Sequence, residues 1–292
     1  MALSYKAGNR IVSDLNSREA FVNGNPDLRH HYKFRGESGD YPDSTILDSA
    51  GFIDGIVTGT KAFGTVAGLI PSFDFNGSSY ITLDDEPFDF EHTDAFSVSF
   101  WIKITATGTY YILAKQNQGS GNNGWAILFY NSGASGLLRM ELADAAQGGT
   151  THRLSTTAGT ITDNSTWKYY TMTYDGSSNI SGMKIYVDGA LQVTGSDDAI
   201  SNTIKNLSHD LVIGASSNGN LDFEGELGDL QIWYRVLTAD EISLLYNSGA
   251  ETYQTVTENK PVADGTNENG TTYTEKDTGK EYILNYGAWI EK

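Results

Sequence analysis

The segment from Trp167 to Leu191 constrains the fold more than any other part of the chain. In its first half Tyr170, Met172 and Tyr174 alternate with other residues, and a similar alternation follows over residues 183–187. A period of two residues predicts β-strands with one buried face and one solvent-facing face. Each run is followed by an Asp-Gly dipeptide, which favours a tight turn. The segment therefore predicts an antiparallel meander whose apolar face needs a packing partner.

Two other segments carry strong strand signals. In residues 96–104 the apolar residues Phe96, Val98, Phe100, Ile102 and Ile104 alternate with Ser97, Ser99, Trp101 and Lys103. We therefore expect a long central strand whose second set of side chains lies on the polar face. Asn76-Gly77 lies between two further alternating runs and predicts a β-hairpin over residues 71–84. More short strands are predicted at residues 30–36, 110–115, 124–131, 137–143, 151–157, 211–216 and 228–236.

The spacing of these strands predicts one all-β domain, a two-sheet antiparallel sandwich over residues 28–250. Thr238 and Glu241 form a capping box that begins a short helix with an apolar stripe of Ile242, Leu245 and Tyr246. We expect this helix to pack against an edge of the sandwich. Three further regions complete the chain: an extended N-terminal arm at residues 1–27, a linker at 251–270 and a small C-terminal β-hairpin segment at 271–292.

Composition excludes several classes of function. The formal net charge of −18 repels nucleic acid, and no basic stripe offsets it. No apolar run is long enough for membrane insertion. The chain contains no Cys, so neither disulfides nor thiolate metal sites contribute. The first 15 residues show no apolar core of a secretory signal, which favours synthesis inside a cell without export by that route.

The order of the motifs resembles the laminin-G-like group of the concanavalin A-like lectin/glucanase superfamily. The resemblance is carried by FDFNGSSYITL, AFSVSFWIKI, TWKYYTMTYDG with YVDG, and LVIG followed by FEGELGDLQIWYRVLTADEI. These motifs appear in order across roughly residues 28–250. The resemblance implies a jelly roll of two curved antiparallel sheets, in agreement with the strand pattern.

The two ends of the chain carry a second resemblance. KAGNRI near the start and TTYTEKDTGKEYILNYGAWIEK at the end resemble terminal segments of virion structural proteins from phages and other microbial viruses. We therefore expect a non-enzymatic decoration, fibre or attachment protein on a virion surface. Its expected partners are capsid proteins, cell-surface glycans and copies of itself in a homo-oligomer. The alternatives are a cellular carbohydrate-binding or adhesion module at the cell surface, and a glycan-active hydrolase.

The hydrolase alternative lacks its expected motif. Retaining glucanases of this fold resemble one another in a Glu-x-Asp-x-x-Glu strand, and their two catalytic carboxylates lie about 5–5.5 Å apart. The nearest segments here, Glu224 to Asp229 and Asp89 to Glu91, have a different spacing. His30-His31 is the only close histidine pair, and strand neighbours point to opposite faces. We therefore expect no enzymatic activity.

Many members of the superfamily carry a structural calcium ion. The loop Asp48-Ser49-Ala50-Gly51 matches the family's N-terminal D-S-x-G loop, and Asp229 matches its late acidic residue. The resemblance therefore implies a possible Ca²⁺ site formed by Asp48, the Gly51 carbonyl and Asp229, with Asp54 as a further ligand. The alternative is that Asp48 caps a turn and that Asp229 is solvated or bound to the backbone.

Lectin sites combine an exposed aromatic ring with a few polar groups. The aromatic candidates here are Trp101, Tyr186 and Trp233, which occupy the polar phase of their strands, and Trp125. Trp125 follows a polar, Gly-rich loop at residues 116–124 that contributes Asn117 and Asn122 as candidates. The alternative for Trp101 and Trp233 is that a neighbouring loop or subunit covers them.

Overall fold

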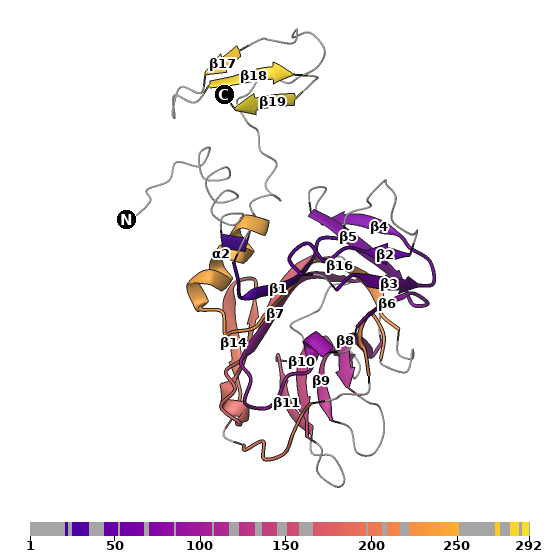
Figure 1. Cartoon of the computed structure of the whole chain (residues 1–292), viewed down its shortest axis with the longest axis vertical. Coiled ribbons are helices and arrows are strands. Elements are labelled where there is room, and N and C mark those ends of the chain that lie inside the picture. The colour runs from indigo at the N-terminus through magenta and orange to yellow at the C-terminus, as the bar shows by residue number, and fades with distance from the viewer. Residues whose placement is uncertain are drawn as a thin grey trace.

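The computed structural model describes most of the chain from Phe21 onwards (Figure 1). The described residues are 21–22, 25–34, 44–51, 53–66, 70–84, 86–106, 108–116, 123–131, 136–144, 151–157, 166–196, 198–205, 209–216, 222–250, 272–274, 281–285 and 288–291. The predicted linker and the candidates Asn117 and Asn122 lie outside them.

Two antiparallel sheets form the body of the molecule, and within the described residues each has eight strands. Sheet A contains, in spatial order, β14 (Ala190–Thr194), β13 (Met183–Val187), β12 (Lys168–Tyr174), β7 (Phe96–Ile104), β16 (Glu224–Trp233), β5 (Ile70–Asn76) and β4 (Phe63–Val66), and β1 (Leu28–Tyr32) also pairs with β16. Sheet B contains β11 (Thr151–Ser155), β10 (Gly136–Ala143), β9 (Gly124–Asn131), β8 (Tyr110–Gln116), β15 (Leu211–Ile213), β6 (Tyr80–Leu83), β3 (Gly55–Thr58) and β2 (Thr45–Ile46). The predicted sandwich fold is confirmed.

Shorter elements complete the described structure. They are the 3₁₀ turns η1 (Glu86–Phe88) and η2 (Ile180–Gly182), the helix α2 (Ala239–Ala250), and a three-stranded antiparallel sheet of β17 (Thr272–Thr274), β18 (Glu281–Asn285) and β19 (Ala288–Glu291). The predicted C-terminal hairpin thus corresponds to β17 and β18, and β19 adds a third strand. No helix within the described ranges is long and apolar enough to cross a membrane.

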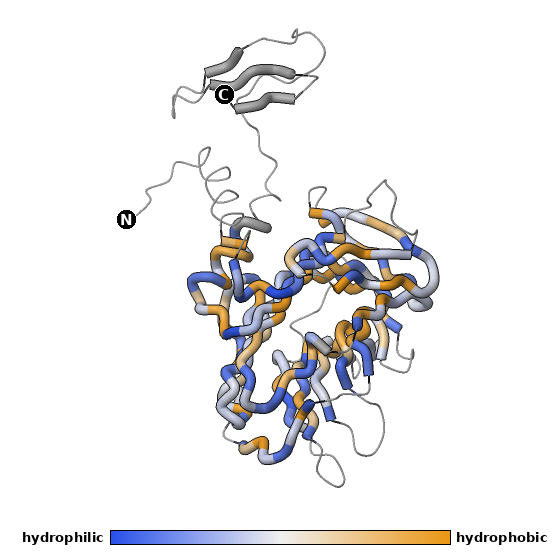
Figure 2. The backbone as a smooth tube through the Cα atoms, in the orientation of Figure 1, coloured by the Kyte–Doolittle hydropathy of each residue, from blue (hydrophilic) through white to orange (hydrophobic). Residues whose placement is uncertain are grey.

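The main hydrophobic core fills the space between the sheets. The predicted inward set of β7, from Phe96 to Ile104, lies in this core together with Tyr170, Met172 and Tyr174 of β12. Sheet B contributes its own alternate residues, among them Trp125 and Ile127. Figure 2 shows hydrophobic positions recurring along the strands of both sheets. The alternation in the sequence therefore identified the inner faces of β7, β12 and β13 correctly.

A second core covers the outer face of sheet A, where the sequence predicted a solvent-facing side. Trp101, Tyr169, Tyr186 and Trp233 from the sheet pack here with residues of α2 and of the N-terminal region. Phe21 stacks on Trp233 with 5.2 Å between ring centroids. Residues 21 and 22 are helical, so the prediction of an extended arm is wrong at these positions. Strand alternation cannot reveal this second layer, because the covering residues come from distant parts of the chain.

Two predicted turns have different outcomes. Asp188 and Gly189 have φ angles of 50° and 78° and join the paired strands β13 and β14, as predicted. At Asn76-Gly77 the chain also turns, and Gly77 has a φ of 74°. However, β5 before it pairs in sheet A and β6 after it pairs in sheet B. The hairpin prediction is therefore wrong, because the turn carries the chain from one sheet to the other.

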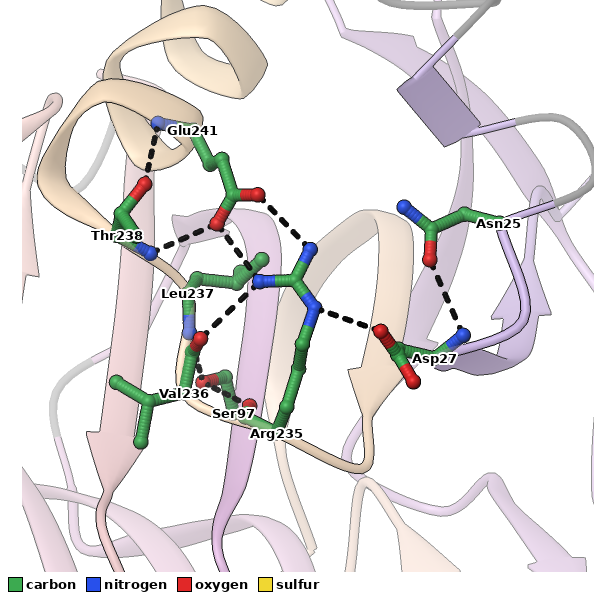
Figure 3. A network of polar contacts seen from close by, with 8 residues as sticks. All are labelled: Asn25, Asp27, Ser97, Arg235, Val236, Leu237, Thr238 and Glu241. Carbon is green, nitrogen blue, oxygen red and sulfur yellow. Dashed lines mark hydrogen bonds and ion pairs between the residues drawn. The ribbon is translucent and has the colours of Figure 1, made fainter.

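Helix α2 begins with the predicted capping box (Figure 3). The backbone amide of Thr238 donates to Glu241, and the Glu241 amide donates back to the Thr238 hydroxyl. Arg235 adds a bidentate pair of hydrogen bonds to the Glu241 carboxylate, at 2.7 and 2.9 Å, and a third to Asp27 at 3.1 Å. These contacts attach the start of α2 to both β16 and the chain before β1. They hold the helix over the outer face of sheet A, where the sequence had predicted an edge.

Shortening an α2 side chain tests the second core. Leu245 is buried in it, whereas Leu191 on β14 is 51% exposed. We expect Leu245→Ala to lower the free energy of unfolding by about 2–4 kcal/mol through lost burial and a residual cavity. Leu191→Ala is the matched control and should change it by less than about 0.5 kcal/mol. Urea denaturation measures both, and equal effects would contradict the packing of α2 on sheet A.

Candidate functional site: a groove beside β1

A groove of about 1030 Å³ opens beside the first strand of the sandwich. Four segments far apart in the sequence form its walls: residues 25–30, residues 50, 51 and 53, the segment 87–95 and residues 234–235 after β16. They meet because β1 pairs with the end of β16. None of these segments carries a recognisable sequence motif for a binding groove, so the site was not predicted from the sequence.

His30 and Asp48 form a rigid part of the wall. The His30 Nδ1 atom donates to Asp48 Oδ2 over 2.7 Å, and the backbone amides of His31, Ala50 and Gly51 donate to the other carboxylate oxygen. Burial raises the pKa of Asp48, but the bond from His30 and the three amides outweigh it and lower this pKa below its ordinary value. The ionised carboxylate therefore ties the 48–51 loop to β1.

Gly51 is required where this loop passes over the pair. A Cβ atom at this position would lie 2.4 Å from Asp48 Oδ2 and 2.5 Å from the carbonyl oxygen of Arg29. Both atoms belong to the anchored wall and cannot easily move away. The glycine of the predicted D-S-x-G loop thus permits close approach of two backbone segments.

An aromatic cluster forms another part of the groove. The Arg29 guanidinium lies 5.5 Å from the centre of the Tyr234 ring, and Phe90 meets the same ring edge-on at 5.1 Å. The Tyr234 hydroxyl donates to the carbonyl of Pro87, and burial raises the pKa of Tyr234 to about 12. Tyr234 therefore remains neutral near pH 7, and Arg29 provides an exposed cation above its ring.

The two acidic residues of the groove make structural contacts. Asp89 pairs with the buried Lys115 at 2.8 Å, and Asp94 accepts a hydrogen bond from the backbone amide of Glu91. Arg235, which also lines the groove, is held by Asp27 and Glu241 in the network of Figure 3. The groove thus combines apolar rings with polar groups whose positions are fixed by the surrounding structure.

The predicted calcium ligands are separated into two local networks. His31 points to the opposite face from His30 and donates through Nε2 to Asp229 Oδ1 over 2.7 Å. Asp229 has a φ of 51° in a bulge of β16, while Asp54 accepts a hydrogen bond from the Asp48 amide. Among the described residues, no three His, Asp or Glu side chains are grouped to hold a metal. These contacts do not fit the implied Ca²⁺ site, and calcium binding stays an untested prediction.

The predicted aromatic candidates are not on an exposed face. Trp101, Trp233 and Tyr186 are 3%, 0% and 7% exposed in the second core, and Trp125 is 1% exposed in the main core. Trp125 also donates from its ring nitrogen to the carbonyl of Phe88. The prediction that these rings are accessible for stacking is therefore wrong. The acidic segments named for catalysis are also engaged: Lys103 pairs with Glu226, and Thr203 donates to Glu91.

The Asp48 contacts predict a specific acid sensitivity. Because the folded-state pKa is lowered, Asp48 stabilises the fold at neutral pH, and this contribution is lost as the pH falls through the folded-state value. We expect Asp48→Asn to be less stable than the parent chain at pH 7 and the difference to narrow below about pH 4. Urea denaturation from pH 3 to 7 measures it. The exposed Asp74→Asn is the control, and a pH-independent difference for Asp48→Asn would contradict the assignment.

Solved structures with the same architecture include botulinum neurotoxin binding domains. The domain of serotype DC in complex with SialylT superposes with a TM-score of 0.55 at 17% identity, covering 77% of this chain and 52% of that one. A structure of botulinum neurotoxin type C, whose cell entry depends on interaction with two ganglioside molecules, gives a TM-score of 0.54 at 17% identity, covering 79% of this chain and 52% of that one. The chain thus spans about half of these structures, and at such identity the likeness shows the fold alone.

A comparison with curated protein sequences found no match. A laminin G family model, described as the Concanavalin A-like lectin/glucanases superfamily, matches residues 75–243. This match covers more than half of the 292 residues and runs from the end of β5 into α2. The chain belongs to the concanavalin A-like lectin/glucanase superfamily.

Proposed function

We propose that this chain is a non-enzymatic glycan-binding module and that the groove beside β1 holds the glycan. The groove volume of about 1030 Å³ lies at the upper limit of small-molecule sites, which typically measure about 300–1,000 Å³. Membership of a superfamily that contains lectins supports the class of ligand. The observation that carries the proposal is the composition of the groove wall.

The wall offers the two kinds of contact that a sugar uses. Tyr234, whose ring is only partly buried, provides apolar ring surface for the C–H face of a pyranose, and the buried Phe90 supports that ring edge-on. Arg29, Thr93 and Asn25 line the same groove and provide polar groups for hydroxyls. The anchoring of the wall by His30 and Asp48 fixes these groups before a ligand arrives, which reduces the entropy lost on binding.

The contacts of the acidic residues favour binding over hydrolysis. A retaining mechanism needs one carboxyl as acid and a second as nucleophile. In the groove Asp89 is neutralised by Lys115, and Asp94 serves as an acceptor for the backbone. Neither residue has the environment of a catalytic carboxyl. Release of reducing sugar from polysaccharides would overturn the non-enzymatic part of the proposal.

Binding measurements with a blocked groove test the site. Ala50 lines the groove and is exposed, so Ala50→Trp fills the space with little cost to folding. We expect the parent chain to bind defined oligosaccharides on a glycan array and Ala50→Trp to lose at least 10-fold in affinity. Arg29→Ala should weaken binding by about 10-fold through loss of a charged hydrogen bond.

The control variant introduces a tryptophan on the surface outside the groove. Gln192→Trp adds a tryptophan on the exposed strand β14 of sheet A and should leave binding unchanged. An array without saturable binding would contradict glycan recognition. Binding that survives in Ala50→Trp would contradict the groove as its site.

We further propose that the module is displayed on a virion surface as a decoration, fibre or attachment protein. The support is the resemblance of both ends of the chain to virion structural proteins, together with a sandwich able to face outward. Mass spectrometry of purified particles from the source virus should then detect this chain among the structural proteins. Its absence from particles would favour the alternative, a cellular carbohydrate-binding or adhesion module.

A further inference from the structure

A row of polar residues crosses the outer face of sheet A. In the strand register Thr171 of β12 lies opposite Ser99 of β7, and Ser99 lies opposite Gln231 of β16. Gln231 in turn lies opposite His31 of β1. These four residues therefore form a continuous row across four adjacent strands, on the face that the second core covers.

Three atoms of this row are buried without a protein partner. Thr171, Ser99 and Gln231 are each 0% exposed. Within the described residues the Thr171 hydroxyl, the Ser99 hydroxyl and Gln231 Oε1 accept or donate no hydrogen bond. An orphaned buried polar group costs about 1–3 kcal/mol, and three neighbouring ones in a folded domain require a physical explanation.

The orientation of the Gln231 amide follows from its neighbour. The Gln231 Nε2 atom donates to Asp229 Oδ2 over 3.2 Å. The Asp229 carboxylate also accepts a hydrogen bond from His31, and a carboxylate acts only as an acceptor. The amide nitrogen must therefore face Asp229, which leaves Oε1 as the unpaired end. A flipped amide would place two acceptors together and is excluded.

The rows on either side contain larger side chains and supply no hydrogen-bond partners to Thr171, Ser99 or Gln231 Oε1. On one side of the row, two residues away along β12 and β7, Tyr169 lies opposite Trp101. On the other side, two residues away along β7 and β16, Ser97 lies opposite Trp233. Ser97 is already occupied, since it donates to the Arg235 carbonyl and accepts from the Leu237 amide. The small side chains of Thr171 and Ser99 thus lie between bulky rings, beneath a layer that buries them.

We propose that ordered water is bound along this row, bridging Thr171, Ser99 and Gln231. A buried water typically makes about three hydrogen bonds to groups that lack other partners, and the row provides three such groups. A water molecule can donate to Gln231 Oε1 and to one hydroxyl while it accepts from the other. The site is a built-in hydration site between sheet A and its outer layer, independent of the groove.

An isosteric substitution distinguishes a hydrated row from a dry one. Thr171→Val removes the hydroxyl and keeps the shape of the side chain. If water is bound, the water loses a partner, and we expect the Tm to fall by roughly 2–4 °C. If the row is dry, removing the unpaired hydroxyl removes the free-energy cost of burying it. The Tm then rises or stays the same. Thr194→Val, on the exposed strand β14, is the control and should leave the Tm unchanged.

A crystal structure of the full chain provides a readout that does not depend on the variant. Electron density for water within hydrogen-bond distance of at least two of the three atoms supports the proposal. A row without such density overturns it, as does a Tm that rises or stays the same in Thr171→Val.

Discussion

The structure depends on the burial of sheet A on both faces. Its inner face packs against sheet B in the main core, and its outer face is covered by α2 and the residues before β1. A strand such as β7 is consequently buried over nearly its whole length. An antiparallel sheet with one wet face is common, so this second layer is a particular feature of the fold. It places large aromatic residues inside the protein that otherwise would be exposed.

The second layer also explains the position of the groove. Arg235 connects the end of β16 to the start of α2 and to Asp27, directly before β1. These hydrogen bonds of Arg235 position the start of β1. The neighbouring residues His30 and His31 then hold β1 through contacts on its two opposite faces. One histidine secures the 48–51 loop and the other secures the bulge of β16. The groove is thus formed where the loop, the first strand and the end of β16 are held together.

The sandwich scaffold and the groove beside β1 are built from different parts of the chain. The meander at 167–191 and the strand at 96–104 contribute to the sandwich and to both of its cores. Their aromatic side chains pack within these cores. Accessible side chains occur instead in the groove beside β1, where Arg29 is exposed and Tyr234 is partly exposed. This division is consistent with a superfamily in which one sandwich supports diverse sites.

Most strands, the inner faces of β7, β12 and β13, the Asp188-Gly189 turn and the capping box of α2 could be predicted from the sequence, because each depends on residues close together in the chain. The short strands β2, β3 and β4 were not predicted, because their residues show no sustained alternation. The sheet to which each strand belongs follows from tertiary contacts, as the turn at Asn76-Gly77 shows. The tertiary structure alone also showed that Trp101 and Trp233 are buried and that Asp48 and Asp229 bind different histidines. These outcomes depend on contacts between segments as far apart as residues 31 and 229, and local periodicity carries no information about such contacts.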